Sequence, residues 1–309
     1  MRCPAATATR RPRRRRSWPH PRRRCRWTTP HPRRSLPDTA AHELVSEAGR
    51  RYPIWVALPA GYAQTDRRYP VVFVTDGAYA FPLVRSIRNL LGQSGRNIED
   101  FILVGLPPEA GQTSKASRSR DYTPSNPLLD PSQHRGKRYT AELYGEADAY
   151  RDFIEQRVFP MVARHYRADM TRKVFAGHSL GGLFGGHVLL TRPSMFEHYI
   201  LSSPSLWFHG HRIRATEQAY ADAHADLPAN VRLYIGMYET PGDTARHYRT
   251  AGMVGDVHEF ERRLRARRYP GLRIDSEVVE HEDHLTVFPD SISRGLQWAL
   301  PGTEPYTPG

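Results

Sequence analysis

The sequence is poor in cysteine and has no long apolar segment. Both cysteines, Cys3 and Cys25, lie within the first 34 residues. The remaining chain therefore has no disulfide framework and no cysteine metal site. No stretch approaches the roughly 18 consecutive apolar residues of a membrane-spanning helix, and the first residues lack the apolar core of a secretion signal. These absences predict a soluble, cytoplasmic protein that does not act at a membrane.

Acidic residues are missing from residues 1–34, where thirteen arginines lie. The formal net charge of +13 therefore resides in this leader, because the rest of the chain has 32 basic and 32 acidic residues. A polyanion-binding tail is one interpretation. We favour a disordered leader over residues 1–36, since Pro and Arg dominate it and no aromatic spacing suggests base stacking. Residues 37–309 suffice for one domain with a large core, for which no nucleic-acid partner is expected.

Along this body, short apolar runs alternate with segments of helical periodicity. Residues 42–46 and 52–58 predict an antiparallel strand pair, and 69–74 form a β-branched and aromatic run typical of a strand buried on both faces. Residues 107–140 lack periodicity and are expected to be a long loop. The alternation indicates an α/β fold with a mostly parallel sheet, helices on both faces and an antiparallel N-terminal hairpin. Together with the motif described next, it predicts the α/β-hydrolase fold. Further predicted strands are 100–105, 174–175, 199–203, 231–237 and 272–279, and predicted helices are 82–91, 141–166 with a kink or early end near Pro160, 180–190, 215–225, 252–268 and 291–300.

One short motif points to chemistry. Residues 177–181 read G-H-S-L-G, between the apolar pairs Val174-Phe175 and Leu183-Phe184. A strand, a tight G-x-S-x-G turn and a helix make the nucleophile elbow of α/β hydrolases, in which small residues leave room for a strained turn that exposes the serine. Ser179 is therefore the candidate nucleophile. A serine hydroxyl needs a base to take its proton and an acid to orient that base.

In α/β hydrolases the carboxylate and then the histidine follow the serine along the chain. For the base we select His284, just beyond the last predicted strand, and its nearest rival is His281. The spacing of these two histidines also suggests a zinc pair, but the H-E-x-x-H helix of zinc peptidases is missing and no metal is expected. For the acid we select Glu239, which follows the strand at 231–237. Asp243, Asp256 and Glu259 stay open as alternatives, as does a Ser–His dyad.

An oxyanion hole requires two backbone N–H groups directed at the position where carbonyl charge develops. One is expected from Leu180, directly after the nucleophile at the start of a helix. The other is expected from the loop after the strand at 69–74, where Gly77 lets the backbone approach closely.

Several of these segments together resemble the putative esterase family of α/β hydrolases, which includes esterase D, feruloyl esterases and the trilactone siderophore hydrolases that open enterobactin and salmochelin. The similarity spans about residues 42–300, and the S-P-S-L-W and E-D-H-L motifs are most similar to the siderophore-hydrolase branch. The segments that carry it are Tyr69–Gly77, Arg120–Pro124, Gly177–Leu183, Ser203–Trp207 and Glu282–Pro289.

The resemblance implies catalytic roles for Ser179 and His284, whereas the acid is less fixed because siderophore hydrolases of this branch can act with a Ser–His pair. It also implies that Arg120 and Trp207 line the substrate pocket, the guanidinium pairing with anionic or catecholate oxygens and the indole stacking on an aromatic acyl group. A loop salt bridge for Arg120 and core packing for Trp207 are the alternatives.

The sequence thus predicts a serine esterase that hydrolyses a small-molecule carboxylic ester through an acyl-enzyme, with a siderophore trilactone as one substrate class. No cofactor is required. An acyltransferase on the same scaffold is the nearest rival, and a non-catalytic or polyanion-binding protein with a hydrolase fold is a more distant one. The oligomeric state is left open.

Overall fold

Within the residues that the computed structural model describes (36–92, 94–130, 143–242, 246 and 252–305), eight strands form one sheet in the order β1-β2-β4-β3-β5-β6-β7-β8. The pairs β1·β2 and β2·β4 are antiparallel and all the others are parallel. The predicted α/β class with an antiparallel N-terminal hairpin is confirmed. The strands are β1 (Thr39–Val45), β2 (Arg51–Ala57), β3 (Tyr69–Thr75), β4 (Ile102–Leu106), β5 (Ala168–His178), β6 (His198–Ser202), β7 (Ala229–Gly236) and β8 (Leu272–Val279).

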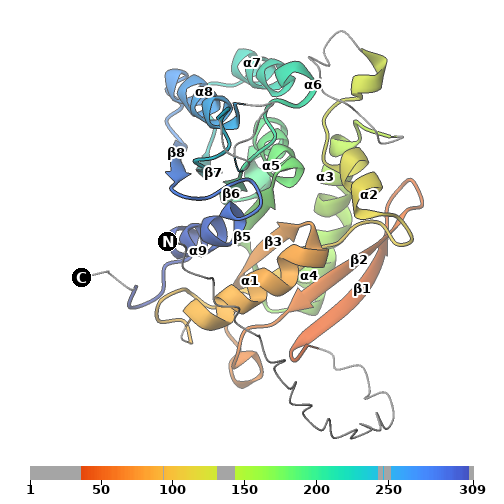
Figure 1. Cartoon of the computed structure of the whole chain (residues 1–309). Coiled ribbons are helices and arrows are strands. Elements are labelled where there is room, and N and C mark those ends of the chain that lie inside the picture. The colour runs from red at the N-terminus through yellow and green to blue at the C-terminus, as the bar shows by residue number, and fades with distance from the viewer. Residues whose placement is uncertain (1–35, 93, 131–142, 243–245, 247–251, 306–309) are drawn as a thin grey trace, which may run out of the picture. The chain divides into compact units, whose positions relative to one another are not determined.

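Helices cover both faces of this sheet (Figure 1). Every residue of β3 is buried, and successive side chains point to opposite faces of a strand. Val72 and Val74 accordingly pack with α1 (Gly77–Leu91) and α9 (Val287–Ala299). Val71 and Phe73 belong to the larger core on the other face. That core also contains apolar side chains of α3 (Ala147–Phe153), α4 (Phe159–His165), α5 (Leu180–Thr191), α7 (Ile213–Ala223) and α8 (Met253–Ala266).

The segment predicted as a long loop contains a helix, α2 (Ser114–Asp121), followed by a 3₁₀ turn at Pro127–Leu129. The loop prediction is therefore wrong for this part, while residues 131–140 lie outside the described residues. Thr113 begins α2 by accepting a hydrogen bond from the N–H of Ala116 through its side chain. The remaining short elements are α6 (Phe208–His211) and 3₁₀ turns at Tyr62–Gln64 and Pro193–Met195.

The helix predicted over 141–166 is divided. A π-helical segment, Ile154–Val158, separates α3 from α4, and Pro160 lies in the first turn of α4. Proline has no N–H to donate and its ring collides with the carbonyl four residues earlier, so it is tolerated in a first turn and not inside a regular helix. The wider π turn before Pro160 supplies that break, so the interruption comes earlier than the expected kink near the helix end.

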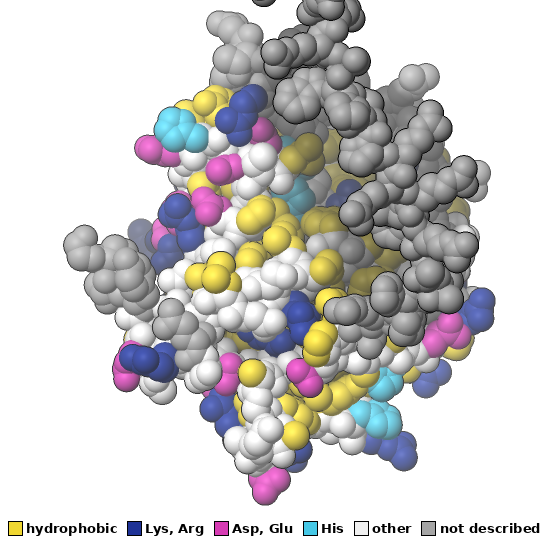
Figure 2. Space-filling view, turned by 60° about the horizontal axis from the view of Figure 1, so that its bottom comes forward, with side chains coloured by type: hydrophobic (Ala, Val, Ile, Leu, Met, Phe, Trp, Pro, Cys, Tyr) yellow, Lys and Arg dark blue, Asp and Glu magenta, His cyan; other side chains and the backbone are white. Residues whose placement is uncertain are grey.

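Charged side chains of both signs are interspersed on the face of the described residues that Figure 2 shows. This mixture fits the balance of 32 basic and 32 acidic residues outside the leader. The leader itself lies outside the described residues up to position 35, so its disorder stays a prediction. In the described part of the chain, no helix is long and apolar enough to cross a membrane.

Candidate active site

Ser179 lies in a sharp turn between β5 and α5, with φ 59° and ψ −117°. Such a conformation is strained for a residue with a side chain and needs support from its neighbours. The flanking glycines are required, because a Cβ at Gly177 would lie 2.4 Å from the carbonyl oxygen of Gly181, and a Cβ at Gly181 would lie 2.3 Å from Oγ1 of Thr75. The turn therefore has the form that the G-x-S-x-G motif predicted.

Three side chains form a continuous hydrogen-bonded chain at the carboxyl end of the parallel strands. Oγ of Ser179 lies 3.0 Å from Nε2 of His284, and Nδ1 of His284 lies 2.6 Å from Oε2 of Glu239. Glu239 is fully buried, and its Oε1 accepts hydrogen bonds from the hydroxyl of Ser203 and from the N–H of Gly236. Both oxygens of this buried carboxylate therefore have a hydrogen-bond partner. The structure thus brings together the three residues selected from the sequence.

The rival candidates lie elsewhere. Asp256 is paired with His211 at 2.8 Å, and Glu259 is paired with Arg214. His281 has a left-handed backbone, with φ 62°, its backbone N–H donates to the sulfur of Met237, and among the described residues no contact between His281 and Ser179 is found. Asp243 lies outside the described residues.

A second histidine, His178, lies against the first. The ring centroids of His178 and His284 are 4.8 Å apart, and Nδ1 of His178 lies 3.2 Å from Oγ of Ser202. Burial, followed by the neighbouring His284, lowers the pKa of His178 to about 3. His178 therefore stays neutral at physiological pH, and His284 is the histidine placed to accept the proton of Ser179. Sequence reasoning gave His178 no role beyond its place in the motif.

The two predicted oxyanion donors lie at the starts of two helices. Leu180 begins α5 and Gly77 begins α1. The first N–H groups of a helix have no partner within it, and none is found for these two among the described residues. The residues on either side of Gly77, Asp76 and Ala78, line the same cavity as Ser179. A Cβ at position 77 would lie 2.8 Å from the backbone nitrogen of Pro107, which explains the glycine. Their role as oxyanion donors stays a prediction.

A cavity of about 550 Å³ opens beside Ser179 and His284. This volume falls in the range of small-molecule sites, which are usually apolar with a few polar groups. The lining follows that pattern. Its apolar side chains are Ala78, Tyr79, Leu83, Pro108, Leu285, Phe288 and Pro289, and its polar ones are Asp76, Ser114, Arg118, His178, Ser179 and His284.

Arg118 is the cationic side chain of this lining, and sequence reasoning missed it. Its Nε and Nη2 donate to the two carboxylate oxygens of Asp76, each at 3.0 Å. Burial raises the pKa of Asp76 against the pull of Arg118, and the same carboxylate raises the pKa of Arg118 in spite of burial. This fork leaves Nη1 of Arg118 without a partner among the described residues. A guanidinium with one nitrogen available in a cavity suits recognition of an anionic or carbonyl oxygen.

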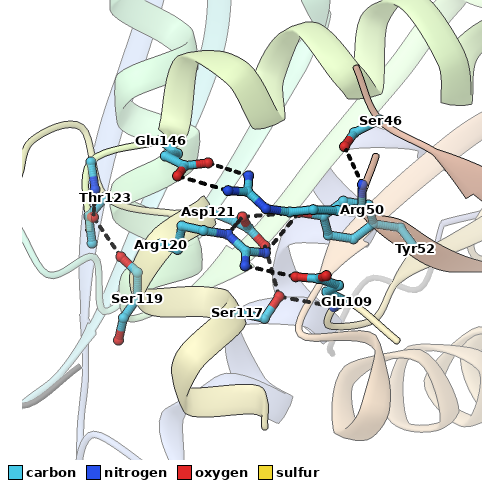
Figure 3. Close-up of polar contacts among 11 residues, drawn as sticks. Ser46, Arg50, Tyr52, Glu109, Ser117, Ser119, Arg120, Asp121, Thr123 and Glu146 are labelled. Carbon is cyan, nitrogen blue, oxygen red and sulfur yellow. Dashed lines mark hydrogen bonds and ion pairs between the residues drawn. The ribbon is translucent and has the colours of Figure 1, made fainter. Parts of the chain in front are cut away.

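Arg120, the arginine predicted to line the pocket, is turned into the protein body (Figure 3). Its side chain is buried, and all three of its nitrogens are used: Nε and Nη2 donate to Asp121, Nη1 donates to Glu109 at 2.7 Å, and Nη2 also donates to the hydroxyl of Tyr52 at 2.9 Å. The expectation of a pocket role is therefore corrected to a buried ion-pair role. The two arginines are two residues apart on α2, about 200° around a helix, so they cannot share a face.

Trp207 is half-buried and packs against the edge of the larger core, with its ring centroid 6.4 Å from that of Phe208. It is not among the side chains that line the cavity. The structure therefore matches the packing alternative for Trp207.

Comparison with known proteins assigns this chain to a family. Residues 46–282 match the model of the family described as Putative esterase. The chain belongs to that family. The siderophore enterobactin esterase of Emericella nidulans is 36% identical over 293 residues, covering 84% of this chain and 92% of that protein. Ferri-bacillibactin esterase BesA of Bacillus subtilis is 27% identical over 278 residues, covering 88% of this chain and 93% of that protein. The solved structure of the siderophore hydrolase EstB from Aspergillus nidulans has a TM-score of 0.70 at 27% identity, covering 86% of this chain and 96% of that one.

This esterase is accordingly a carboxylic ester hydrolase of the serine type. Its site has the parts that acyl transfer needs: a hydroxyl in contact with an imidazole, a buried carboxylate behind that imidazole, and helix N-termini next to the hydroxyl. In the described part of the esterase, no group of three or more side chains suited to hold a metal ion occurs.

Proposed function

We propose that the esterase cleaves its substrate through an acyl-enzyme on Ser179. The unbroken chain from Oγ of Ser179 through His284 to Glu239 supports this assignment. His284 takes the proton from Ser179 as Oγ attacks the ester carbonyl, and Glu239 holds the imidazole in the required tautomer. The N–H groups of Gly77 and Leu180 donate hydrogen bonds to the carbonyl oxygen and stabilise the negative charge that develops on it. The proton then passes from His284 to the departing alcohol.

In the second half of the reaction, His284 takes a proton from water, and the resulting hydroxide equivalent attacks the acyl group. Collapse of the tetrahedral species breaks the bond to Oγ of Ser179, and His284 returns the proton to that oxygen. The products are a carboxylic acid and the free serine. Every proton in this cycle is handled by groups within the site, so no cofactor is required.

We propose a siderophore ester as the substrate. The relatives named above are described as esterases of enterobactin and ferri-bacillibactin, and two features of the cavity support the same class here. Its apolar walls, including Tyr79, Leu83 and Phe288, suit an aromatic acyl group. Nη1 of Arg118 offers a charged donor to the oxygens that such a group carries. Arg118 thereby takes the role that the resemblance implied for Arg120.

The first test is Ser179→Ala, which removes the nucleophile and leaves the fold intact. Turnover of a p-nitrophenyl ester should fall by about 10⁴-fold or more, and covalent labelling by a fluorophosphonate should disappear. Ser86→Ala, at an exposed position on α1, is the matched control and should keep both. If Ser179→Ala kept the rate, the nucleophile would lie elsewhere.

The substrate class is tested separately with an ester panel that runs from p-nitrophenyl acetate to ferric enterobactin, with product analysis in the presence of added alcohols. A higher kcat/KM for the siderophore ester is the expected result. Preference for short simple esters would refute the siderophore proposal and leave the mechanism standing, whereas a new ester formed from the added alcohol would indicate acyl transfer.

A further inference from the structure

The turn after β6 lies between the nucleophile and the acid. In the sheet, β6 is flanked by β5, which leads to Ser179, and by β7, which leads to Glu239. The segment Ser202–Ser205 therefore leaves the sheet at the midpoint between two members of the catalytic chain. All four of its residues are buried.

This segment holds the backbone of Ser179 on both sides. The N–H of Ser179 donates to the carbonyl oxygen of Ser202 at 3.0 Å, and the N–H of Ser205 donates to the carbonyl oxygen of Ser179 at 3.0 Å. Pro204 packs so closely on α5 that a Cβ at Gly182 would lie 2.9 Å from its Cα. The strained conformation of Ser179 is thus maintained by a neighbouring turn as well as by its own glycines.

At its start, the segment also holds the acid. Ser203 has a left-handed backbone, with φ 42°, and its N–H donates to the carbonyl oxygen of Tyr234 at 2.7 Å. This unusual conformation directs its hydroxyl to Oε1 of Glu239, leaving Oε2 to His284. Ser203 is therefore a positioning residue for the carboxylate.

At its end, the segment reaches the reacting atom. Oγ of Ser205 lies 3.3 Å from Oγ of Ser179, and no other partner of this hydroxyl is found in the described part of the chain. Ser179 directs its own proton to Nε2 of His284, so the proton in the serine pair must come from Ser205. With 2% of its surface exposed, Ser205 has little water as an alternative acceptor.

We propose that Ser205 is a further catalytic residue, whose hydroxyl donates to Oγ of Ser179 as that oxygen leaves the acyl group. The proposal rests on the acyl-enzyme mechanism above. It adds no covalent step, since the bond to the acyl carbon breaks as before and His284 still returns the proton to Ser179. Ser205 keeps its own proton throughout.

The effect is expected to be unequal in the two halves of the reaction. In the acyl-enzyme, Oγ of Ser179 is an ester oxygen, which is a weak hydrogen-bond acceptor. As the tetrahedral species collapses, charge returns to this oxygen, and the bond from Ser205 becomes charge-assisted and stronger. An interaction that is stronger in the transition state than in the ground state accelerates that step. Acylation begins from a free hydroxyl that already accepts this bond, so it gains less.

The test is Ser205→Ala, with the two half-reactions measured apart. Release of p-nitrophenolate in single turnovers with excess enzyme gives acylation, and decay of the acyl-enzyme, followed by intact mass after quenching, gives deacylation. Deacylation should slow about tenfold, the loss expected for one hydrogen bond to a developing charge, while acylation changes less than about threefold. Ser86→Ala again serves as the control and should change neither rate.

Equal slowing of both half-reactions would show that Ser205 only positions the elbow, and an unchanged deacylation rate would exclude any role for its hydroxyl. Either result would overturn the proposal. Failure of the acyl-enzyme mechanism itself would look different, because no acyl adduct would form on the wild-type protein. If Ser205→Ala does not fold, Ser205→Cys keeps nearly the same volume with a weak donor and should show the same selective loss at smaller size.

Discussion

Two polar clusters include arginines of α2, and they differ in whether every guanidinium nitrogen has a hydrogen-bond partner. On one side, Arg118 lines the cavity and donates to Asp76 through Nε and Nη2, and its Nη1 has no partner among the described residues. On the other side, Arg120 has every nitrogen bonded to Tyr52, Glu109 or Asp121. Both clusters place charge in a buried setting, where an unpaired group is costly. A fully paired cluster stabilises the fold, whereas a cluster with one unpaired donor can use that donor to bind a substrate.

The same contrast separates the buried carboxylates. Asp121 is paired with an arginine, which does not release its proton, and Glu239 is paired with a histidine, which does. The Arg120 cluster is therefore expected to affect stability, and the Glu239 cluster is expected to affect turnover. Substitutions in each cluster test this division.

Glu239→Gln should have the largest effect. The amide keeps the shape of the side chain but no longer stabilises the imidazolium or fixes its tautomer, so kcat should fall by about 10³- to 10⁴-fold. Because the hydrogen-bonding shape is retained, the free energy of unfolding should change by no more than about 2 kcal/mol. Steady-state kinetics and urea unfolding measure the two quantities. A loss of kcat below tenfold would indicate a Ser–His dyad in which Glu239 is dispensable.

Arg120→Met should lower the free energy of unfolding by about 3–5 kcal/mol, because it leaves Asp121 buried without its cation. Burial already raises the pKa of Asp121, and loss of Arg120 raises it further. With a folded-state pKa above the unfolded value, the folded protein binds the additional proton, so stability falls as pH rises through that interval. The deficit measured by urea unfolding should therefore be smaller at low pH, where the carboxyl group of Asp121 is protonated in both the folded and the unfolded state, than at neutral pH.

The control for this variant is Arg273→Met, at an exposed position on β8, which should change stability by less than about 0.5 kcal/mol. A deficit for Arg120→Met that did not depend on pH would show that Asp121 is not the group left unpaired.

Arg118→Lys should have the smallest effect and a different character. Lysine keeps a positive charge beside Asp76 but not the planar fork, so the nitrogen offered to the cavity is lost. We expect kcat/KM for an ester with an anionic acyl group to fall about tenfold, with little change for p-nitrophenyl acetate. Arg120→Lys is the matched comparison on the same helix and should reduce stability and leave this substrate preference unchanged. Equal losses on both esters for Arg118→Lys would indicate a purely structural role.

The sheet and the catalytic chain follow from local signals in the sequence. Val71–Val74 and Val231–Met237 are recognisable as strands because β-branched, aromatic and other apolar residues predominate in them. Because these strands are parallel, their carboxyl ends lie at the same edge of the sheet. Residues that shortly follow each strand are therefore brought together. Glu239 and His284 were found in this way, without knowledge of any contact.

The helix α2 was not predictable by the same means. Its sequence, SKASRSRD, has no apolar stripe, and three of its four buried residues, Ser117, Arg120 and Asp121, are held by hydrogen bonds and ion pairs. Hydrophobic periodicity therefore gives no signal there. Without the helix, nothing in the sequence distinguishes Arg118 from Arg120, because only helical geometry sends residues two apart to different sides. The contacts of Ser203 and Ser205 depend on long-range packing in the same way.

Asp76, Ser179 and Ser203 have positive φ and directly follow the parallel strands β3, β5 and β6. A left-handed backbone costs a residue with a side chain about 1–2 kcal/mol. Efforts to make this esterase more heat-resistant therefore meet a trade-off at this edge, where glycine would relieve strain and remove a working side chain. Substitutions at the opposite, amino-terminal edge of the sheet carry no such conflict, and that edge is where an engineer should begin.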